Sequence, residues 1–250
     1  TRLKYRYLDI RRRTVTNNLV TRHKITMAIR NFLDKENFLE VETPVLCKST
    51  PEGARDYLVP SRVNKGKFYA LPQSPQLFKQ LLMVGGFNKY FQIAPCFRDE
   101  DARSDRVYGE FYQLDFEMAF ATEEDVYSVG EKIFKDVFHK FSDKQISEPP
   151  FRRIPFKEAM EKYGSDKPDL RFDMKINDIT DILKDTSVTF LKKDIDDGGI
   201  INAIVVKDTA SLYSRKDLDN LSLFVKNYKA QGISYLKYNN ELTGSISKLL

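Results

Sequence analysis

The sequence predicts an α+β protein, on three observations. Residues 111–120 alternate apolar and polar side chains with a period of two, the pattern of a strand with one buried face. Apolar residues within 25–33 recur at i, i+3, i+4, i+7 and i+8, which predicts an amphipathic helix. Residues 200–238 have the pattern of a strand, a helix and a strand, which predicts a second, smaller α+β module.

Residues 91–120 predict a hairpin of two strands joined by a charged loop. The second strand has an apolar face and a polar face, the apolar one formed by Tyr112, Leu114, Phe116, Met118 and Phe120, the polar one by Phe111, Gln113, Asp115 and Glu117. Solvent exposure alone would explain such a polar face. The loop favours a binding site instead, since charges of both signs suit a polyanionic substrate that carries metal ions; they are Arg98, Asp99, Glu100, Asp101, Arg103, Asp105 and Arg106.

The composition fits a soluble folded protein of one large or two ordinary domains, with 250 residues, 41% of them hydrophobic and 31% charged. A net charge of +5 allows a nucleic-acid partner without requiring one. Cys47 and Cys96 form no CxxC pair and lie far in sequence from both histidines, which argues against a zinc site or a disulfide framework. No signal peptide or membrane-spanning segment is recognisable, so we expect a cytoplasmic protein that does not bind membranes.

The segment FRDED, the arginine-containing loop that follows and the segment EFYQLDFEM resemble motif 2 of class II aminoacyl-tRNA synthetases, in the form typical of aspartyl-tRNA synthetases. The resemblance implies that Arg98 is the catalytic arginine, contacting both the ATP α-phosphate and the carboxylate of the amino acid. It places Asp99 and Glu100 at the ATP site and stacks Phe111 on the adenine.

The same resemblance assigns Gln113 and Asp115 to the aspartate site, and Arg103 and Arg106 to contacts with the tRNA acceptor end. The turn before Phe111 is longer than in most bacterial members, so no role is carried over to Val107 or Tyr108.

The first forty-four residues resemble the family's motif 1 and the segment that precedes it. A helix, a short strand at 38–41 and Pro44 have the layout of motif 1, which implies a homodimer. Residues 1–13 hold six basic residues and one acid, so they predict either a solvated linker or a phosphate-binding segment. They resemble the connector that follows the anticodon-binding OB domain of aspartyl-tRNA synthetases.

The segment Thr50–Arg62 predicts a surface loop, since Pro51 and Gly53 interrupt regular structure. It resembles the flexible loop with which aspartyl-tRNA synthetases close over the amino acid. On that resemblance, Glu52 lies near the substrate ammonium.

Residues 67–71 predict a strand, and a helix follows with Ser74 as N-cap, Pro75 at its first position and Gly85 at its end. Its predicted buried stripe is Leu77, Phe78, Leu81 and Leu82. From its surroundings alone, Lys79 would be an exposed lysine. The segment QSPQLFKQ, however, resembles the aspartyl enzymes, which implies that Ser74, Gln76 and Lys79 bind aspartate.

Beyond the hairpin, residues 122–125 predict a capping box, followed by a helix that buries Val126, Tyr127, Ile133, Phe134, Val137, Phe138 and Phe141. A linker at 142–150 and a short helix from Pro155 to Gly164 come next. A strand is predicted at 200–206 and another at 233–238. Between them, a helix capped by Ser214 and ended by Gly232 should bury Leu218, Leu221, Phe224, Val225 and Tyr228.

The resemblance covers nearly the whole chain and implies a class II antiparallel sheet flanked by helices, with a small α+β insertion domain. Residues 1–13 would be a linker from an N-terminal OB domain, 14–172 the first part of the catalytic domain, and 173–250 an incomplete, GAD-like insertion domain. We expect a fragment of a longer protein, inactive alone, because the family's motif 3 and its arginines are not in this chain.

The implied activity is that of an aspartate–tRNA ligase, with ATP and Mg²⁺ as cofactors and L-aspartate and tRNA-Asp as partners, without a metal-binding side chain in this chain. Two alternatives stay open. One is a non-catalytic paralogue, and the other is an enzyme that uses aspartyl-adenylate without tRNA, such as an asparagine synthetase. Whether tRNA-Asn is also charged cannot be read from these residues.

Overall fold

The computed structural model describes residues 1–101 and 109–247, which form two compact units, 1–151 and 152 onward. The first unit contains α1 (Arg6–Asp9), α2 (Arg13–Lys35), β1 (Leu39–Glu40), β2 (Leu58–Pro60), β3 (Phe68–Ala70), α3 (Gln76–Val84), β4 (Lys89–Phe97), β5 (Glu110–Met118) and α4 (Glu123–Phe141). The second contains α5 (Phe156–Tyr163), β6 (Ile176–Asp178), α6 (Thr189–Asp196), β7 (Asn202–Ile204), α7 (Arg215–Lys226), β8 (Leu236–Asn239) and β9 (Glu241–Gly244).

The first unit is built on the predicted hairpin, whose strands β4 and β5 pair antiparallel over nine residues each. Their register sets Gln92 opposite Asp115. The short strand β1 adds to β4 in parallel, which gives a three-stranded sheet in the order β1-β4-β5. The α+β class predicted from the sequence is confirmed.

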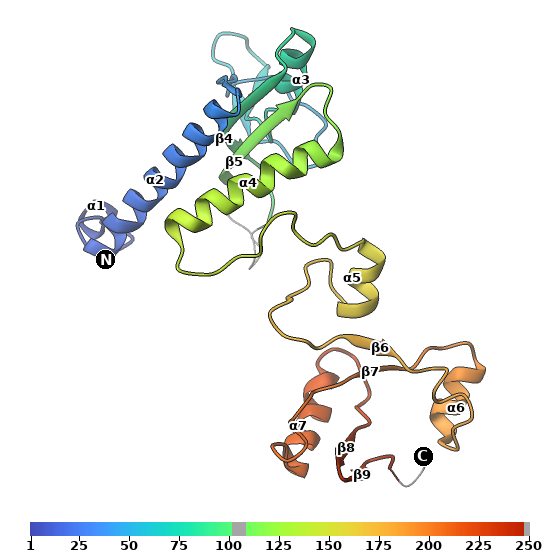
Figure 1. Cartoon of the computed structure of the whole chain (residues 1–250). Coiled ribbons are helices and arrows are strands. Elements are labelled where there is room, and N and C mark those ends of the chain that lie inside the picture. Colours follow the sequence, from blue (N-terminus) through green and yellow to red (C-terminus); the bar gives the residue numbers. More distant parts are fainter. Residues whose placement is uncertain (102–108, 248–250) are drawn as a thin grey trace. The chain divides into compact units, whose positions relative to one another are not determined.

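One face of this sheet packs against α2 and α4, which lie beside it in Figure 1. The core is formed by Leu33, Phe38, Phe91, Val129 and Ile133. The rings of Phe38 and Phe116 meet edge to face with their centroids 5.8 Å apart. Each such side chain stabilises the fold by roughly 1.5–3 kcal/mol when fully buried, so the apolar face of the hairpin fixes where its polar face points.

The alternation predicted for β5 holds over its middle, where Leu114, Phe116 and Met118 pack on the core. It is wrong at Phe120, which is fully exposed, because the strand ends at Met118 and Phe120 has a positive φ of 56°. Tyr112 is also more than half exposed. The guanidinium of Arg22 on α2 covers its ring at 4.8 Å.

The predicted capping box of α4 is confirmed, since Thr122 and Asp125 bond reciprocally. The predicted buried stripe is confirmed at Ile133, while Val137 and Phe141 are half-buried. It is wrong for four side chains, because the sheet covers only a narrow face of the helix. These four are exposed: Val126, Tyr127, Phe134 and Phe138.

Helix α3 begins at Gln76, one residue after the predicted start, and the Ser74 hydroxyl accepts the Gln76 N–H at 3.0 Å. It ends at Gly85 as predicted. The predicted burial of Leu77 and Leu81 is wrong, since both are exposed. The segment predicted as a loop from Thr50 ends in β2, which pairs with β3.

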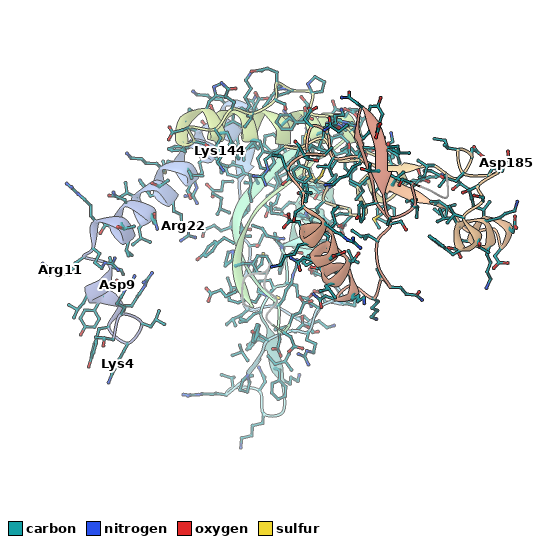
Figure 2. The ribbon with its side chains drawn as sticks, turned by 90° about the horizontal axis from the view of Figure 1, so that it is seen from below. Lys4, Asp9, Arg11, Arg22, Lys144 and Asp185 are labelled. Atoms are coloured by element: carbon teal, nitrogen blue, oxygen red, sulfur yellow. The ribbon has the colours of Figure 1, made fainter. Side chains whose placement is uncertain are left out.

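The N-terminal basic segment folds around one acid. Asp9 is buried, and its carboxylate forms ion pairs with Arg2, Arg6 and Arg12. Hydrogen bonds from Arg2 lower the pKa of Asp9 most, and Arg12 lowers it further. Figure 2 shows Asp9 within this segment, near the start of the chain. Three of its six basic residues are therefore held by an internal partner, so the segment is more structured than a solvated linker.

The second unit consists of short elements around two hairpin-like pairs, β6–β7 and β8–β9. Helix α5 and its end at Gly164 follow the prediction, and so does Ser214 as N-cap of α7. The structure adds that Gly164 is left-handed and that Ser214 and Asp217 form a capping box. The prediction that Gly232 ends this helix is wrong, since α7 ends at Lys226.

Of the predicted α7 stripe, Leu218 is buried and Val225 is half-buried, while the predicted burial of Leu221, Phe224 and Tyr228 is wrong, since all three are exposed. The strands β6 and β9 and the helix α6 were not predicted.

Candidate active site

The site lies on the face of the hairpin opposite the core, where α3 packs over both strands. The register brings side chains of β4 and β5 together in pairs on this face: Tyr90 opposite Glu117, Gln92 opposite Asp115, Ala94 opposite Gln113, and Cys96 opposite Phe111. Because side chains alternate along a strand, all eight lie on one surface. This is the polar face predicted from the sequence, and α3 shields it from solvent.

Lys79 of α3 reaches down to this surface and binds two carboxylates. Its Nζ lies 2.9 Å from Asp115 Oδ1 and 3.2 Å from Glu117 Oε2. Only 12% of the Lys79 side chain and 11% of the Asp115 side chain are exposed. The structure therefore excludes the possibility that Lys79 is an ordinary surface lysine. An ammonium has three donors, so two acceptors leave one N–H for a ligand.

Negative charge is in excess around Lys79. Burial raises the pKa of Asp115, and Lys79 only partly counteracts it while Glu117 and Glu52 add to it. Burial alone would lower the pKa of Lys79, but the hydrogen bond and charge of Asp115, with those of Glu117, raise it. Surplus negative charge raises the pKa of acids and bases alike. The site thus favours an added cation, and an added anion would need further positive charge.

Asp115 also offers an unused acceptor. Its Oδ2 is buried and has no hydrogen-bond partner among the residues that the structure describes. A buried carboxylate oxygen without a donor is costly. The arrangement suits a ligand that brings an N–H group to this oxygen.

Glu52 is held in place rather than solvated. Its carboxylate accepts hydrogen bonds from Ser74 Oγ at 2.6 Å and from Thr50 Oγ1 at 2.9 Å. Glu52 and Ser74 line a pocket of about 360 Å³, together with Pro44, Leu46, Cys47, Lys48, Thr50, Pro72, Leu77 and Phe78. The predicted site residue Gln76 is exposed on α3 and does not belong to this lining.

At the other end of the hairpin, Arg98 and Phe111 lie together. The guanidinium carbon of Arg98 is 5.1 Å from the centroid of the Phe111 ring. The neighbouring predicted ATP ligands, Asp99 and Glu100, are exposed. The predicted tRNA contacts Arg103 and Arg106 lie outside the described residues.

Two buried groups support the floor of the site. The thiol of Cys96 donates to Gln113 Oε1 at 3.2 Å, and burial raises the pKa of this thiol to about 11. On the same strand, Gln92 Oε1 accepts from Tyr90 Oη at 3.0 Å and from Thr43 Oγ1 at 2.9 Å.

Of these supporting residues, Gln113 was predicted, whereas Thr43, Tyr90, Gln92 and Cys96 were not. Glu117 was predicted on the polar face but not as a partner of Lys79. Aligning the two predicted strands in register would have found Tyr90, Gln92 and Cys96, because pairing places them on the same face as Asp115 and Gln113.

Residues 1–244 match the family model described as tRNA synthetases class II (D, K and N). The chain belongs to this family of class II tRNA synthetases. Within it, the chain is similar to aspartate–tRNA ligases: it is 55% identical over 250 residues to the aspartate–tRNA ligase of Clostridium tetani, and 51% identical over 251 residues to the aspartate–tRNA(Asp/Asn) ligase of Rickettsia canadensis. All of this chain is matched in both, but only 42% of either relative.

Solved structures agree on the family. Asparaginyl-tRNA synthetase from Pyrococcus horikoshii, complexed with asparaginyl-adenylate, matches 64% of this chain and 39% of its own, with a TM-score of 0.55 and 28% identity. A structure titled as a putative aspartyl-tRNA synthetase from Leishmania major matches 56% of this chain and 26% of its own, with a TM-score of 0.50 and 27% identity. Within residues 1–101 and 109–247, each helix is too short or too polar to cross a membrane.

Proposed function

We propose that this chain carries the aspartate-activating site of an aspartate–tRNA ligase. The observation that carries the proposal is the nearly buried Lys79 between Asp115 and Glu117, on the floor formed by the motif 2 hairpin. Sequence identity of 50–55% with aspartate–tRNA ligases over the whole chain supports it. The chain spans 41–42% of the length of those relatives, and the proposed activity is that of the intact enzyme.

Each part of aspartate has a matching group in this site. The substrate ammonium would bind near the carboxylates of Glu52 and Asp115, where negative charge is in excess. The Oδ2 atom of Asp115 has no donor among the described residues. The third donor of Lys79 suits the side-chain carboxylate of the substrate. That carboxylate needs additional positive charge, which in this family an arginine beyond this chain would provide.

Arg98 suits the α-phosphate and the reacting carboxylate. In the proposed first step, an oxygen of the aspartate α-carboxylate attacks the ATP α-phosphorus, a P–O bond forms, and pyrophosphate leaves with the electrons of the broken bond. In the second step, a ribose hydroxyl of the tRNA attacks the activated carbonyl and releases AMP. Positioning and charge neutralisation carry out most of such catalysis, so no protein nucleophile is needed.

ATP and Mg²⁺ enter this proposal as a substrate pair. Phe111 and Arg98 offer a ring and a guanidinium side by side, which fit a base and a phosphate. In the described part of the chain, no group of three or more His, Cys, Asp or Glu side chains could hold a metal ion. We therefore assign no step to the ion.

The proposed macromolecular partners are tRNA-Asp and a second copy of the enzyme, bound through motif 1. Among the relatives, some are named for tRNA-Asp alone and others for both tRNA-Asp and tRNA-Asn.

The experiment is ATP–pyrophosphate exchange with the intact enzyme, run with aspartate and asparagine separately, followed by charging of tRNA-Asp. Exchange that depends on aspartate, followed by charging, is expected. Exchange without charging would favour an enzyme that uses the adenylate elsewhere, and no exchange would favour a non-catalytic paralogue.

A further inference from the structure

A buried glutamine, Gln73, bonds the segment that carries Glu52 to the rest of the first unit. Gln73 is only 2% exposed and lies directly before Ser74. Its Oε1 accepts the Ala54 N–H at 2.9 Å, and its Nε2 donates to the Ala54 carbonyl at 2.9 Å. The side-chain amide therefore pairs with both backbone groups of one residue, as a neighbouring strand would.

The same amide group reaches one residue further. Gln73 Nε2 also donates to Asp56 Oδ1 at 2.6 Å, and the other oxygen of Asp56 accepts from the Ser49 hydroxyl. Nε2 thus needs its two hydrogens for two acceptors, and Oε1 needs its lone pair for one donor. An amide satisfies this pattern, whereas a carboxylate, a hydroxyl or an apolar group cannot.

The adjacent residues Gln73 and Ser74 therefore hold the segment at two positions, Ala54 and Glu52. Gln73 fixes Ala54, and Ser74 binds the carboxylate of Glu52 at 2.6 Å. A further pair fixes the segment at Arg55, whose carbonyl accepts the Asp99 N–H and whose Nε donates to the Asp99 carbonyl, both at 2.9 Å. Asp99 follows Arg98, so the segment connects the proposed amino-acid and phosphate ends of the site.

We propose that Gln73 is a positioning residue for aspartate binding, which acts through Ala54 to hold Glu52 where the substrate ammonium would lie. This inference rests on the proposed function for its kinetic part, while the hold of Gln73 on Ala54 can be measured independently. Gln73 is not proposed to touch the substrate or the reacting atoms.

The informative substitution is Gln73→Glu, because it keeps the shape and replaces the donor with a carboxylate facing Asp56. Two carboxylates in a buried place repel each other and raise the pKa of the new acid. At low pH the new acid is protonated and can donate again, so the defect should shrink as pH falls. Gln80→Glu is the matched control, since Gln80 is exposed on α3.

The first measurement is hydrogen exchange of the peptide containing Ala54, in the chain as it stands. We expect protection in the unmodified chain, faster exchange by at least tenfold in Gln73→Glu at pH 8, and no change in Gln80→Glu. Equal protection in all three proteins would overturn the hold on Ala54. Should Gln73→Glu fail to fold, Gln73→Met replaces it, and the same result is expected at every pH.

The second measurement is the KM for aspartate in the intact enzyme between pH 6 and pH 8. Gln73→Glu should raise the KM for aspartate on the order of tenfold at pH 8, equivalent to about 1.4 kcal/mol. Its effects on kcat and on the KM for ATP should be smaller. Adding Asp56→Asn should restore part of the loss, because the asparagine supplies a donor to the new carboxylate.

If Gln73→Glu speeds hydrogen exchange at Ala54 but leaves the KM for aspartate unchanged, the positioning role is overturned and the proposed function stays intact. If the intact unmodified enzyme shows no aspartate-dependent ATP–pyrophosphate exchange, the proposed function is overturned instead. Hydrogen exchange would still decide whether Gln73 holds Ala54.

Discussion

The backbone N–H of Arg98 donates to the carbonyl of Gly109 at 2.7 Å, so the proposed catalytic arginine rests against a residue that has no side chain. A Cβ at Gly109 would lie 2.1 Å from the Tyr57 hydroxyl oxygen and 2.8 Å from the Arg98 carbonyl oxygen. Real Cβ contacts are essentially never shorter than 3.0 Å. The close approach therefore explains a glycine at this point of the hairpin.

Gly109→Ala should displace the backbone of Arg98 and the ring of Tyr57. Overpacking of this kind costs roughly 1–3 kcal/mol. We expect lower stability in urea unfolding and, in the intact enzyme, pyrophosphate exchange reduced on the order of tenfold or more. The control is Gly130→Ala on α4, where a Cβ meets nothing within 4 Å and alanine favours a helix by roughly 0.5–1 kcal/mol. Equal stability of Gly109→Ala and the unmodified chain would contradict the close packing.

Arg98→Lys should reduce pyrophosphate exchange by on the order of a hundredfold or more while folding survives. Lysine keeps the positive charge but loses the bidentate fork and the planar stacking over Phe111. The readout is exchange rate at saturating ATP and aspartate, with circular dichroism as the folding check. Exchange within a few-fold of the unmodified enzyme would exclude the proposed role of Arg98.

The buried thiol of Cys96 should make stability fall at alkaline pH. Its folded pKa is about 11, above the ordinary 9.0, so the unfolded thiol ionises first as pH rises. The unfolded state then binds fewer protons, and stability decreases between pH 9 and 11 by on the order of 2–3 kcal/mol. Cys96→Ser keeps a donor to Gln113 and removes this titration.

Urea unfolding at pH 8, 9, 10 and 11 measures the effect. The serine variant should lose less stability over this range than the unmodified chain. Some loss above pH 10 should remain in both, because burial also raises the pKa of Tyr90. Identical pH slopes in the two proteins would show that Cys96 does not titrate as described.

The intact enzyme should be a two-fold dimer through motif 1. Helix α2 leaves Val20 and Met27 exposed, on the side of the helix opposite to Ile29 in the core. Homo-oligomers of this kind most often have two-fold symmetry. Sedimentation at micromolar concentration should give the mass of a dimer, and a monomer would contradict the prediction.

Local patterns in the sequence were enough to predict the hairpin, the capping box at Thr122, the N-cap at Ser214, and the helix ends at Gly85 and Gly164. These features depend on residues that are close in sequence, so period and capping chemistry determine them. Burial was predicted less well on α3, α4 and α7. An apolar stripe shows that a face can be buried, but whether another element covers it depends on distant parts of the chain.

The candidate site shows the same division. Lys79 and Asp115 were assigned by resemblance, but their direct ion pair, and the second partner Glu117, follow from how α3 crosses the hairpin. The hold of Gln73 on Ala54 joins residues nineteen positions apart and leaves no periodic signal in the sequence. Such contacts come from tertiary packing, which the pattern of one strand or helix does not contain.

Lys79 is proposed to recognise the side-chain carboxylate of aspartate. Aspartate and asparagine are nearly isosteric, so discrimination must use charge and hydrogen bonding. Asp115 and Glu117 already hold two donors of Lys79, which leaves the third for the substrate. Removing one partner of a buried ion pair costs roughly 3–5 kcal/mol, or on the order of a thousandfold.

The most direct test is adenylate formation by the intact Lys79→Met enzyme with aspartate and with asparagine. The control is Lys140→Met, which removes an exposed lysine paired with Asp136 on α4. We expect the kcat/KM for aspartate to fall a hundredfold or more, ATP binding to stay nearly unchanged, and the difference in kcat/KM between aspartate and asparagine to become smaller. If Lys79→Met keeps a normal KM for aspartate and still discriminates against asparagine, Lys79 does not recognise the side-chain carboxylate.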